Sequence, residues 1–179
     1  MRHSLLGGSL LALVAGCNTA PGDSYQVYID PAFTTDQQQA ILQACQEWED
    51  NVPVHLQITI SECSGKHNRQ ICLHSNPSTS VDFLGQTHVS EGVAGDTRGD
   101  TSGLGGTDGG EIELYVNLIT SHQAQLSQVA EHEIAHAMGL SHHVGAFLMN
   151  PEYGYPLSCD DVQQWYYVRG QRGFCSLTP

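Results

Sequence analysis

Basic residues are scarce in this sequence. Only 6 lysines and arginines stand against 19 aspartates and glutamates, so the formal net charge is −13 at pH 7. Nucleic acids and anionic membrane surfaces bind proteins through basic patches, and the composition therefore argues against both as partners. An acidic surface instead suits the binding of cations. With 179 residues, 40% of them hydrophobic, the chain has the size of one globular domain with a substantial core.

Long apolar stretches are also missing, except for one near the N-terminus. The run from Leu5 to Gly16 is too short to span a bilayer as a helix, but it has the length of a signal-peptide core and follows the basic residue Arg2. It ends in Val14-Ala15-Gly16-Cys17, which resembles the bacterial lipobox, in which the peptide is cut before the cysteine and the cysteine is acylated. An ordinary signal peptide that is cut after a small residue is the alternative.

The lipobox resemblance implies a lipoprotein signal peptide at residues 1–16, lipidation of Cys17 and a tether at residues 17–24. We then expect an exported protein of the bacterial cell envelope, at the outer membrane or the cell surface, that meets the membrane only through its N-terminal lipid. Asn18 rather than aspartate follows the cysteine, which favours outer-membrane delivery. The folded domain is expected at residues 25–179.

No Cys-x-x-Cys spacing occurs, which argues against a cysteine-based zinc site and a thioredoxin-like redox motif. Export to an oxidising compartment permits disulfides, and the simplest hypothesis pairs near neighbours. Cys63 with Cys72 would close a short polar loop, and Cys159 with Cys175 would join the last helix to the tail. Sequence alone leaves this connectivity open. Cys45 is left over on the apolar face of a predicted helix, where we expect a buried, unreactive thiol.

Apolar periodicity predicts both strands and helices. Thr34 or Thr35 can cap a first helix, and Ser158 with Asp161 can form a capping box at the start of the last one. Ser121 or Ser127 is expected to open the helix between them. The strands are predicted at 25–29, 54–60, 71–74, within 81–89 and at 111–116.

The stretch HEIAHAMGLSH, residues 132–142, carries the strongest functional signal. His132 and His136 are one helical turn apart on the same face, where both imidazoles can bind one metal ion. Gly139 allows the backbone to leave the helix with a positive φ, so that His142 can approach as a third ligand. The five fixed positions arise by chance on the order of once in 10⁴ such sequences. The competing interpretation is an amphipathic helix with hydrogen-bonded core histidines.

Three neutral imidazoles leave Zn²⁺ an open fourth position for water, as in catalytic rather than structural sites. Glu133 lies beside His132 and is placed to act as the general base on that water. His143 is adjacent to the third ligand, but the spacing of the motif selects His142.

Met149 follows the motif by seven residues, and Pro151 and Tyr153 come directly after it. With the long histidine motif, these residues resemble the metzincin zinc proteases, and among them the matrixins. The resemblance implies a zincin-like α+β domain, with a twisted mixed sheet and three main helices. An upper subdomain would reach to about residue 142, and a small lower one would occupy 143–179 below the active-site cleft.

The same resemblance assigns further residues. Met149 would form an apolar floor beneath the histidines, and the Pro151 to Tyr153 segment would be the wall of the pocket that receives the residue after the cleaved bond. Gln128 matches a position at the bottom of that pocket, and Asp161 one that hydrogen-bonds the backbone around the methionine. The strand at 111–116 would be the sheet edge that pairs with an extended substrate. An ordinary internal strand is the alternative for that segment.

A Gly-, Thr- and Asp-rich stretch, residues 92–110, lies where matrixins bind structural calcium and a second zinc. A loop with solvated carboxylates, a Ca²⁺ site and a second zinc site are the three interpretations. The residues near it that could serve as ligands are Asp96, Asp100, Asp108, Glu111 and His88.

We therefore expect a monomeric zinc metalloendopeptidase that acts on protein or peptide substrates. Secreted matrixins are kept latent by a propeptide cysteine, and no such motif precedes the first strand, so we expect activity once the protein is exported and metallated. Two alternatives remain. One is a catalytically idle, peptide-binding lipoprotein of the same fold, and the other is a metal-dependent amidase acting on cell-wall peptide.

Overall fold

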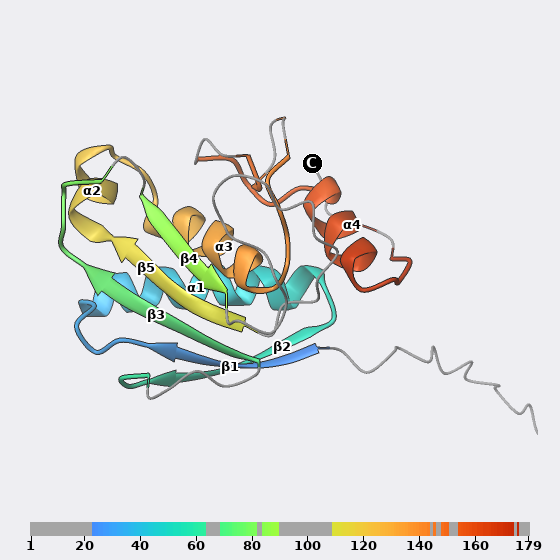
Figure 1. Cartoon of the computed structure of the whole chain (residues 1–179), viewed down its shortest axis with the longest axis horizontal. Helices are drawn as coiled ribbons and strands as arrows, with labels where there is room; N and C mark the ends of the chain where they lie inside the picture. The colour runs from blue at the N-terminus through green and yellow to red at the C-terminus, as the bar shows by residue number, and fades with distance from the viewer. Residues whose placement is uncertain are drawn as a thin grey trace, which may run out of the picture.

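The computed structural model in Figure 1 describes residues 23–63, 69–81, 84–89, 109–143, 145, 148–150, 154–173 and 175. These residues form strands and helices in a mixed order, as the sequence predicts for an α+β domain. The elements are β1 (Asp23–Ile29), α1 (Thr35–Asn51), β2 (Val54–Ile60), β3 (Gln70–Asn76), β4 (Gly85–Val89), β5 (Gly109–Tyr115), α2 (Val116–Ser121), α3 (Leu126–Ala137) and α4 (Cys159–Val168).

The strands form one mixed sheet in the order β2-β1-β3-β5-β4. All neighbours pair in parallel except β4 and β5, which are antiparallel. This order corrects the expectation for residues 111–116. Residues 111–115 belong to β5, an internal strand between β3 and β4, which is the alternative named for this segment, while Val116 begins α2. The edge of the sheet is β4. Alternation of polar and apolar residues cannot distinguish the two, because an internal strand with one exposed face alternates in the same way.

Helix α1 begins where the sequence predicts. Thr34 is its N-cap: the backbone N–H of Gln37 donates to the threonine side chain at 3.3 Å, and the backbone N–H of Thr34 donates to the Gln37 side chain at 2.9 Å. This capping box satisfies N–H groups that have no partner within the helix. Cys45 and Trp48 are fully buried on the inner face of α1, and burial raises the pKa of the Cys45 thiol to about 12. The expected burial of Cys45 is confirmed, and a thiol that is buried and protonated in this way is expected to be unreactive.

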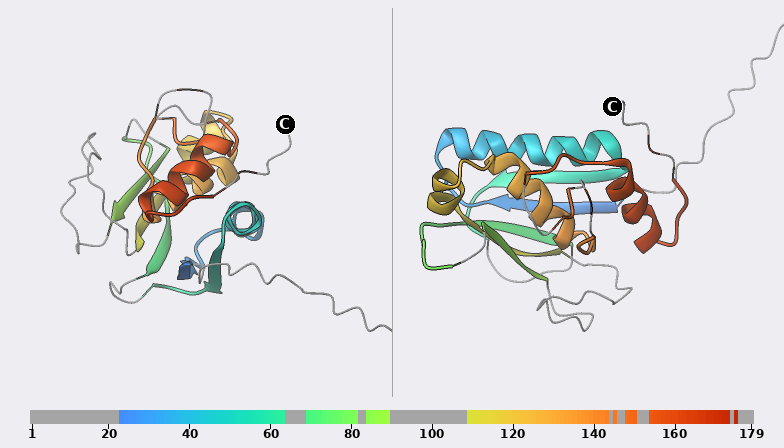
Figure 2. Two further views of the ribbon diagram at one scale, coloured as in Figure 1. Left: turned by 90° about the vertical axis from the view of Figure 1, so that its right-hand side faces the viewer. Right: turned by 90° about the horizontal axis from the view of Figure 1, so that it is seen from above.

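Helices α1 and α3 cover the same face of the sheet (Figure 2). Ile41 and Trp48 from α1 and Ile134 from α3 belong to one core cluster with the inward residues of the strands. The indole N–H of Trp48 donates to the carbonyl of Glu131 at 3.0 Å, so the two helices are joined by a buried hydrogen bond as well as by apolar contact. This contact fixes α3, the helix that carries the histidine motif.

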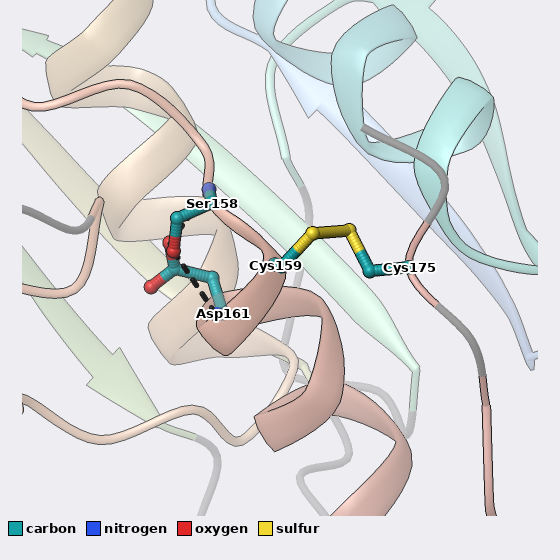
Figure 3. Close-up of a disulfide and its surroundings, with 4 residues drawn as sticks. All are labelled: Ser158, Cys159, Asp161 and Cys175. Carbon is teal, nitrogen blue, oxygen red and sulfur yellow. Dashed lines mark hydrogen bonds between the residues drawn. A yellow bond between two sulfur atoms is a disulfide. The ribbon is translucent and has the colours of Figure 1, made fainter. Parts of the chain in front are cut away.

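Helix α4 lies at one end of the sheet, where it packs beside the segment that follows α3 (Figure 1). Both predicted disulfides are present: Cys63 pairs with Cys72, and Cys159 pairs with Cys175, which attaches the start of α4 to the tail (Figure 3). Figure 3 also shows the capping box of Ser158 and Asp161 at the first turn of α4, as the sequence predicts.

Three boundaries differ from the expectations. Strand β1 begins at Asp23, so the last two residues of the expected 17–24 tether belong to the sheet. The chain forms the short helix α2 directly after β5, where no helix was predicted. Neither Ser121 nor Ser127 opens α3, whose N-cap is Gln125 without a side-chain hydrogen bond. Among the described residues, no helix is long and apolar enough to cross a membrane.

Candidate metal centre

Helix α3 presents the first two histidines of the motif. His132 and His136 are four residues apart on this helix, and the helix ends one residue after His136. Gly139 then adopts a φ of 98°, a left-handed conformation that residues with a Cβ rarely take. The N–H of Leu140 bonds back to the carbonyl of Ala135 at 3.0 Å, which closes the helix end and turns the chain. This turn brings His142 back over the helix, as the sequence predicts.

The three imidazoles converge on one point. The Nε2 atoms of His132, His136 and His142 lie 3.0–3.1 Å from one another. In the part of the chain that is described, they are the one group of three or more side chains placed to hold a metal ion. His132 is buried, His136 is half-buried and His142 is exposed, so the site reaches the surface on the side of the third ligand.

The opposite nitrogens of two rings bind backbone carbonyls. His132 Nδ1 lies 2.6 Å from the carbonyl oxygen of Leu148, and His136 Nδ1 lies 2.9 Å from that of Leu140. A carbonyl only accepts, so both Nδ1 atoms carry the proton, and both Nε2 atoms carry a lone pair. Lone pairs that face one another repel, and a cation between them removes the repulsion.

The protonation of these rings also suits a cation. Burial lowers the pKa of His132 to about 3, with a further contribution from the nearby His136. Burial likewise lowers the pKa of His136 and of His142. The imidazoles are therefore neutral at pH 7, which is the form that binds metals.

Zinc fits this donor set. Tetrahedral coordination with Zn–N bonds of about 2.0–2.1 Å places nitrogen ligands roughly 3.3 Å apart, close to the spacing of the three Nε2 atoms. Carbonyl partners on Nδ1, as His132 and His136 have, are the usual second contacts of zinc-binding histidines. The residues present thus match the nature, number and geometry of a three-histidine zinc site.

Glu133 lies between α3 and the edge strand β4. Its side chain is buried. Burial and the neighbouring His136 lower the pKa of His142, and Glu133 opposes that shift by a smaller contribution. The hydroxyl of Thr87 in β4 lies 2.6 Å from Glu133 Oε2. A Cβ atom on Gly85, two residues earlier in β4, would lie 2.7 Å from Glu133 Cγ. Sequence reasoning missed both β4 residues, since neither belongs to a motif and the strand could only be placed coarsely within 81–89.

The segment with Met149 is held as the resemblance predicts. Met149 is fully buried, and the carboxylate of Asp161 accepts hydrogen bonds from the backbone N–H groups of Leu148 and Met149, each at 3.1 Å. The expected role of Asp161 is confirmed. The Nε2 atom of His143 lies 3.3 Å from Asp161, and the histidine that joins His132 and His136 in the cluster is His142, the one that the spacing of the motif selects.

The structure does not test the other assignments. Gln128 is a half-buried residue of α3. Pro151, Tyr153 and Cys17 lie outside the described residues. So do the candidate calcium ligands Asp96, Asp100 and Asp108 and the side chain of His88, whereas Glu111 is a half-buried residue of β5.

The family match agrees with the histidine motif. The sequence profile of the matrixin family matches residues 23–167. Among solved structures, a similar chain is high choriolytic enzyme 1, a hatching enzyme zinc-protease from the medaka fish Oryzias latipes, with 14% sequence identity and a TM-score of 0.40. The match covers 69% of this chain and 47% of that one, so the chain spans about half the length of this similar protein. No curated protein matches the sequence.

Proposed function

The chain belongs to the matrixin family of zinc proteases, and on that premise we propose that it is a zinc-dependent endopeptidase, lipid-anchored at the bacterial cell envelope. The observation that carries the proposal is the convergence of three neutral imidazoles, with Glu133 held beside them at the edge of the sheet. A structural zinc site would need four protein ligands, and it would have no use for a buried carboxylate next to the metal.

His132, His136 and His142 would hold the zinc ion through their Nε2 atoms. Zinc held there would supply Lewis-acid chemistry, which lowers the pKa of water to about 7 and polarises a carbonyl group. The protein supplies the base: Glu133 takes up the proton of the attacking water and later delivers it to the nitrogen of the departing amine. The bond between the carbonyl carbon and that nitrogen breaks, and no covalent intermediate with the protein is required.

We propose that an extended peptide binds along β4. This strand ends the sheet, and it lies directly against Glu133 through Thr87. Backbone pairing with an edge strand tolerates many sequences, which suits the cleavage of unfolded protein. Gln128, Pro151 and Tyr153 remain the proposed pocket residues.

The test of the catalytic proposal is cleavage of an unfolded protein by the purified, zinc-loaded chain, with the fragments identified by mass spectrometry. We expect internal cuts that a chelator abolishes and that added zinc restores. Glu133→Ala should retain zinc and lose at least about 100-fold in kcat, the scale of general acid–base catalysis. Cleavage that is unchanged in Glu133→Ala would eliminate the mechanism.

Hydrolysis of cell-wall peptide without any cut in protein would support the amidase, and zinc retention with neither activity would support a peptide-binding domain.

The anchor rests on the sequence Val14-Ala15-Gly16-Cys17 and has its own test. We expect the protein to fractionate with bacterial membranes and to carry a lipid on Cys17. Cys17→Ser should release it to the soluble fraction, and continued membrane association of that variant would refute lipidation at this site.

A further inference from the structure

Two residues of β4 that face α3, Gly85 and Thr87, both contact the side chain of Glu133. They are two residues apart in the strand, so both lie on the same side of it. A Cβ on Gly85 would lie 2.7 Å from Glu133 Cγ and 2.8 Å from Oε1, closer than atoms pack. The absence of a side chain at position 85 therefore makes the room that the carboxylate occupies.

Thr87 has two acceptors within reach. Its hydroxyl lies 2.6 Å from Glu133 Oε2 and 3.0 Å from the backbone carbonyl oxygen of Glu133, and it has one proton to donate. A charged acceptor gives the shorter and stronger hydrogen bond. A carbonyl inside a helix, moreover, already accepts from the N–H four residues later. The carboxylate is accordingly the preferred partner.

We propose that Thr87 is a positioning residue, whose hydroxyl holds the carboxylate of Glu133 through Oε2 in the orientation in which that carboxylate takes up and returns the proton during peptide hydrolysis. This inference rests on the proposed function, in which Glu133 is the general base. A carboxylate on a flexible side chain loses rate when it samples other rotamers, and a short hydrogen bond from a rigid strand removes that freedom. Because β4 is also the strand along which we place the substrate, one element would align both the base and the peptide.

The kinetic test uses three variants of the zinc-loaded enzyme. Thr87→Val keeps the shape and removes the hydroxyl, and we expect kcat to fall by about 10- to 100-fold with KM changed less than about two-fold. Thr87→Ser keeps the hydroxyl and should recover to within about three-fold of the wild type. Thr120→Val is the matched control, because the exposed Thr120 donates to the Val116 carbonyl on α2, and its activity should equal that of the wild type. A kcat within about two-fold of the wild type in Thr87→Val would overturn the proposal.

A second readout does not depend on activity. In the metal-free protein, Thr87→Val should lower Tm by about 4 °C or more, but by at most half as much in a Glu133→Ala background. An equal loss in both backgrounds would mean that the hydroxyl serves only the backbone carbonyl of Glu133, and the proposal would fall. If the wild type cleaves nothing, the proposed function fails, whereas this pair of measurements still decides whether Thr87 holds the carboxylate.

Gly85→Ala tests the same arrangement without removing a hydrogen-bonding group. The added methyl group should displace Glu133 from Thr87, so we expect a loss in kcat of about ten-fold or more, with full zinc content. Wild-type kcat in this variant would show that the position of Glu133 beside β4 does not matter for the reaction.

Discussion

The carboxylate of Asp161 accepts a hydrogen bond from the backbone N–H of Met149 at 3.1 Å. It also accepts one from the N–H of Leu148, whose carbonyl oxygen in turn accepts from the Nδ1 atom of the ligand His132 at 2.6 Å. A continuous chain of contacts therefore runs from α4 to the metal centre. The last helix is thus part of the support of the site, although it contributes no ligand.

We expect Asp161→Ala to weaken both the fold and the metal site. Asp161 is fully buried, and its removal leaves the N–H groups of Leu148 and Met149 without their acceptor, at a cost of about 3–5 kcal/mol in the free energy of unfolding. Zinc affinity should fall by about 10- to 100-fold, the range found for residues behind a ligand.

Ser158→Ala is the control for Asp161. It removes the hydroxyl that caps α4 and donates to Asp161 Oδ2, but it leaves the carboxylate in place as the acceptor for Leu148 and Met149. It should therefore cost about 1 kcal/mol with little effect on zinc binding. Denaturant unfolding and zinc titration measure the two quantities. Equal effects of the two substitutions on zinc affinity would contradict a specific role for Asp161.

Gln164 provides a milder perturbation of the third ligand. Its side-chain amide donates to the carbonyl of Ser141 at 3.2 Å and so attaches the segment with His142 to α4. We expect Gln164→Leu to reduce zinc affinity by about 3- to 10-fold, because one neutral hydrogen bond contributes about 1 kcal/mol. Gln163→Leu, an exposed position on the same helix, is the matched control. A Gln164→Leu protein with unaltered zinc affinity would show that other contacts hold His142.

The metal ligands could be predicted from sequence because helix geometry and one glycine determine their positions locally. His132 and His136 share a helix face, and the positive φ of Gly139 is a property of its position in the motif. Asp161 and Met149 could be assigned only through resemblance, since no local rule joins residues on two different elements.

Long-range pairing was the step that sequence reasoning did not reach. The 111–116 segment was expected at the sheet edge, but β4 adds to it as an antiparallel strand. The alternation of polar and apolar residues shows which face of a strand is buried, but it does not show which strands are its neighbours in the sheet. For the same reason Thr87 was not found: its partner Glu133 is 46 positions away, and a threonine in a strand is unremarkable by itself.

The metal-free protein should lose stability in acid through His132. Burial lowers the folded-state pKa of His132 from 6.5 to about 3, so between these values the unfolded chain binds a proton that the folded chain excludes. The stabilising effect is thus complete above pH 6.5 and is lost as the pH falls toward 3, at no more than about 1.4 kcal/mol per pH unit. Unfolding of the wild type and of His132→Gln, each measured from pH 7 to pH 4.5, isolates this contribution. His122→Gln, which removes an exposed imidazole, is the control, and parallel pH profiles of the wild type and His132→Gln would contradict the assignment.

Glu131 should produce the opposite dependence. This carboxyl group is buried between α1 and α3, and burial, with a smaller contribution from Glu47, raises its pKa from 4.5 to about 8. The folded state retains a proton that the unfolded state releases above pH 4.5, so the stabilising effect is complete below pH 4.5 and is lost as the pH rises through 8.

We expect Glu131→Gln, which is neutral at every pH, to gain stability relative to the wild type between pH 5 and pH 9. Glu62→Gln, at an exposed position, should show a constant difference. Thermal unfolding of the metal-free proteins at pH 5 and pH 9 measures this difference. The wild type and Glu131→Gln both keep the three histidines, so titration of the histidines cancels in the comparison. A difference in Tm that does not grow with pH would show that Glu131 is already ionised in the folded protein.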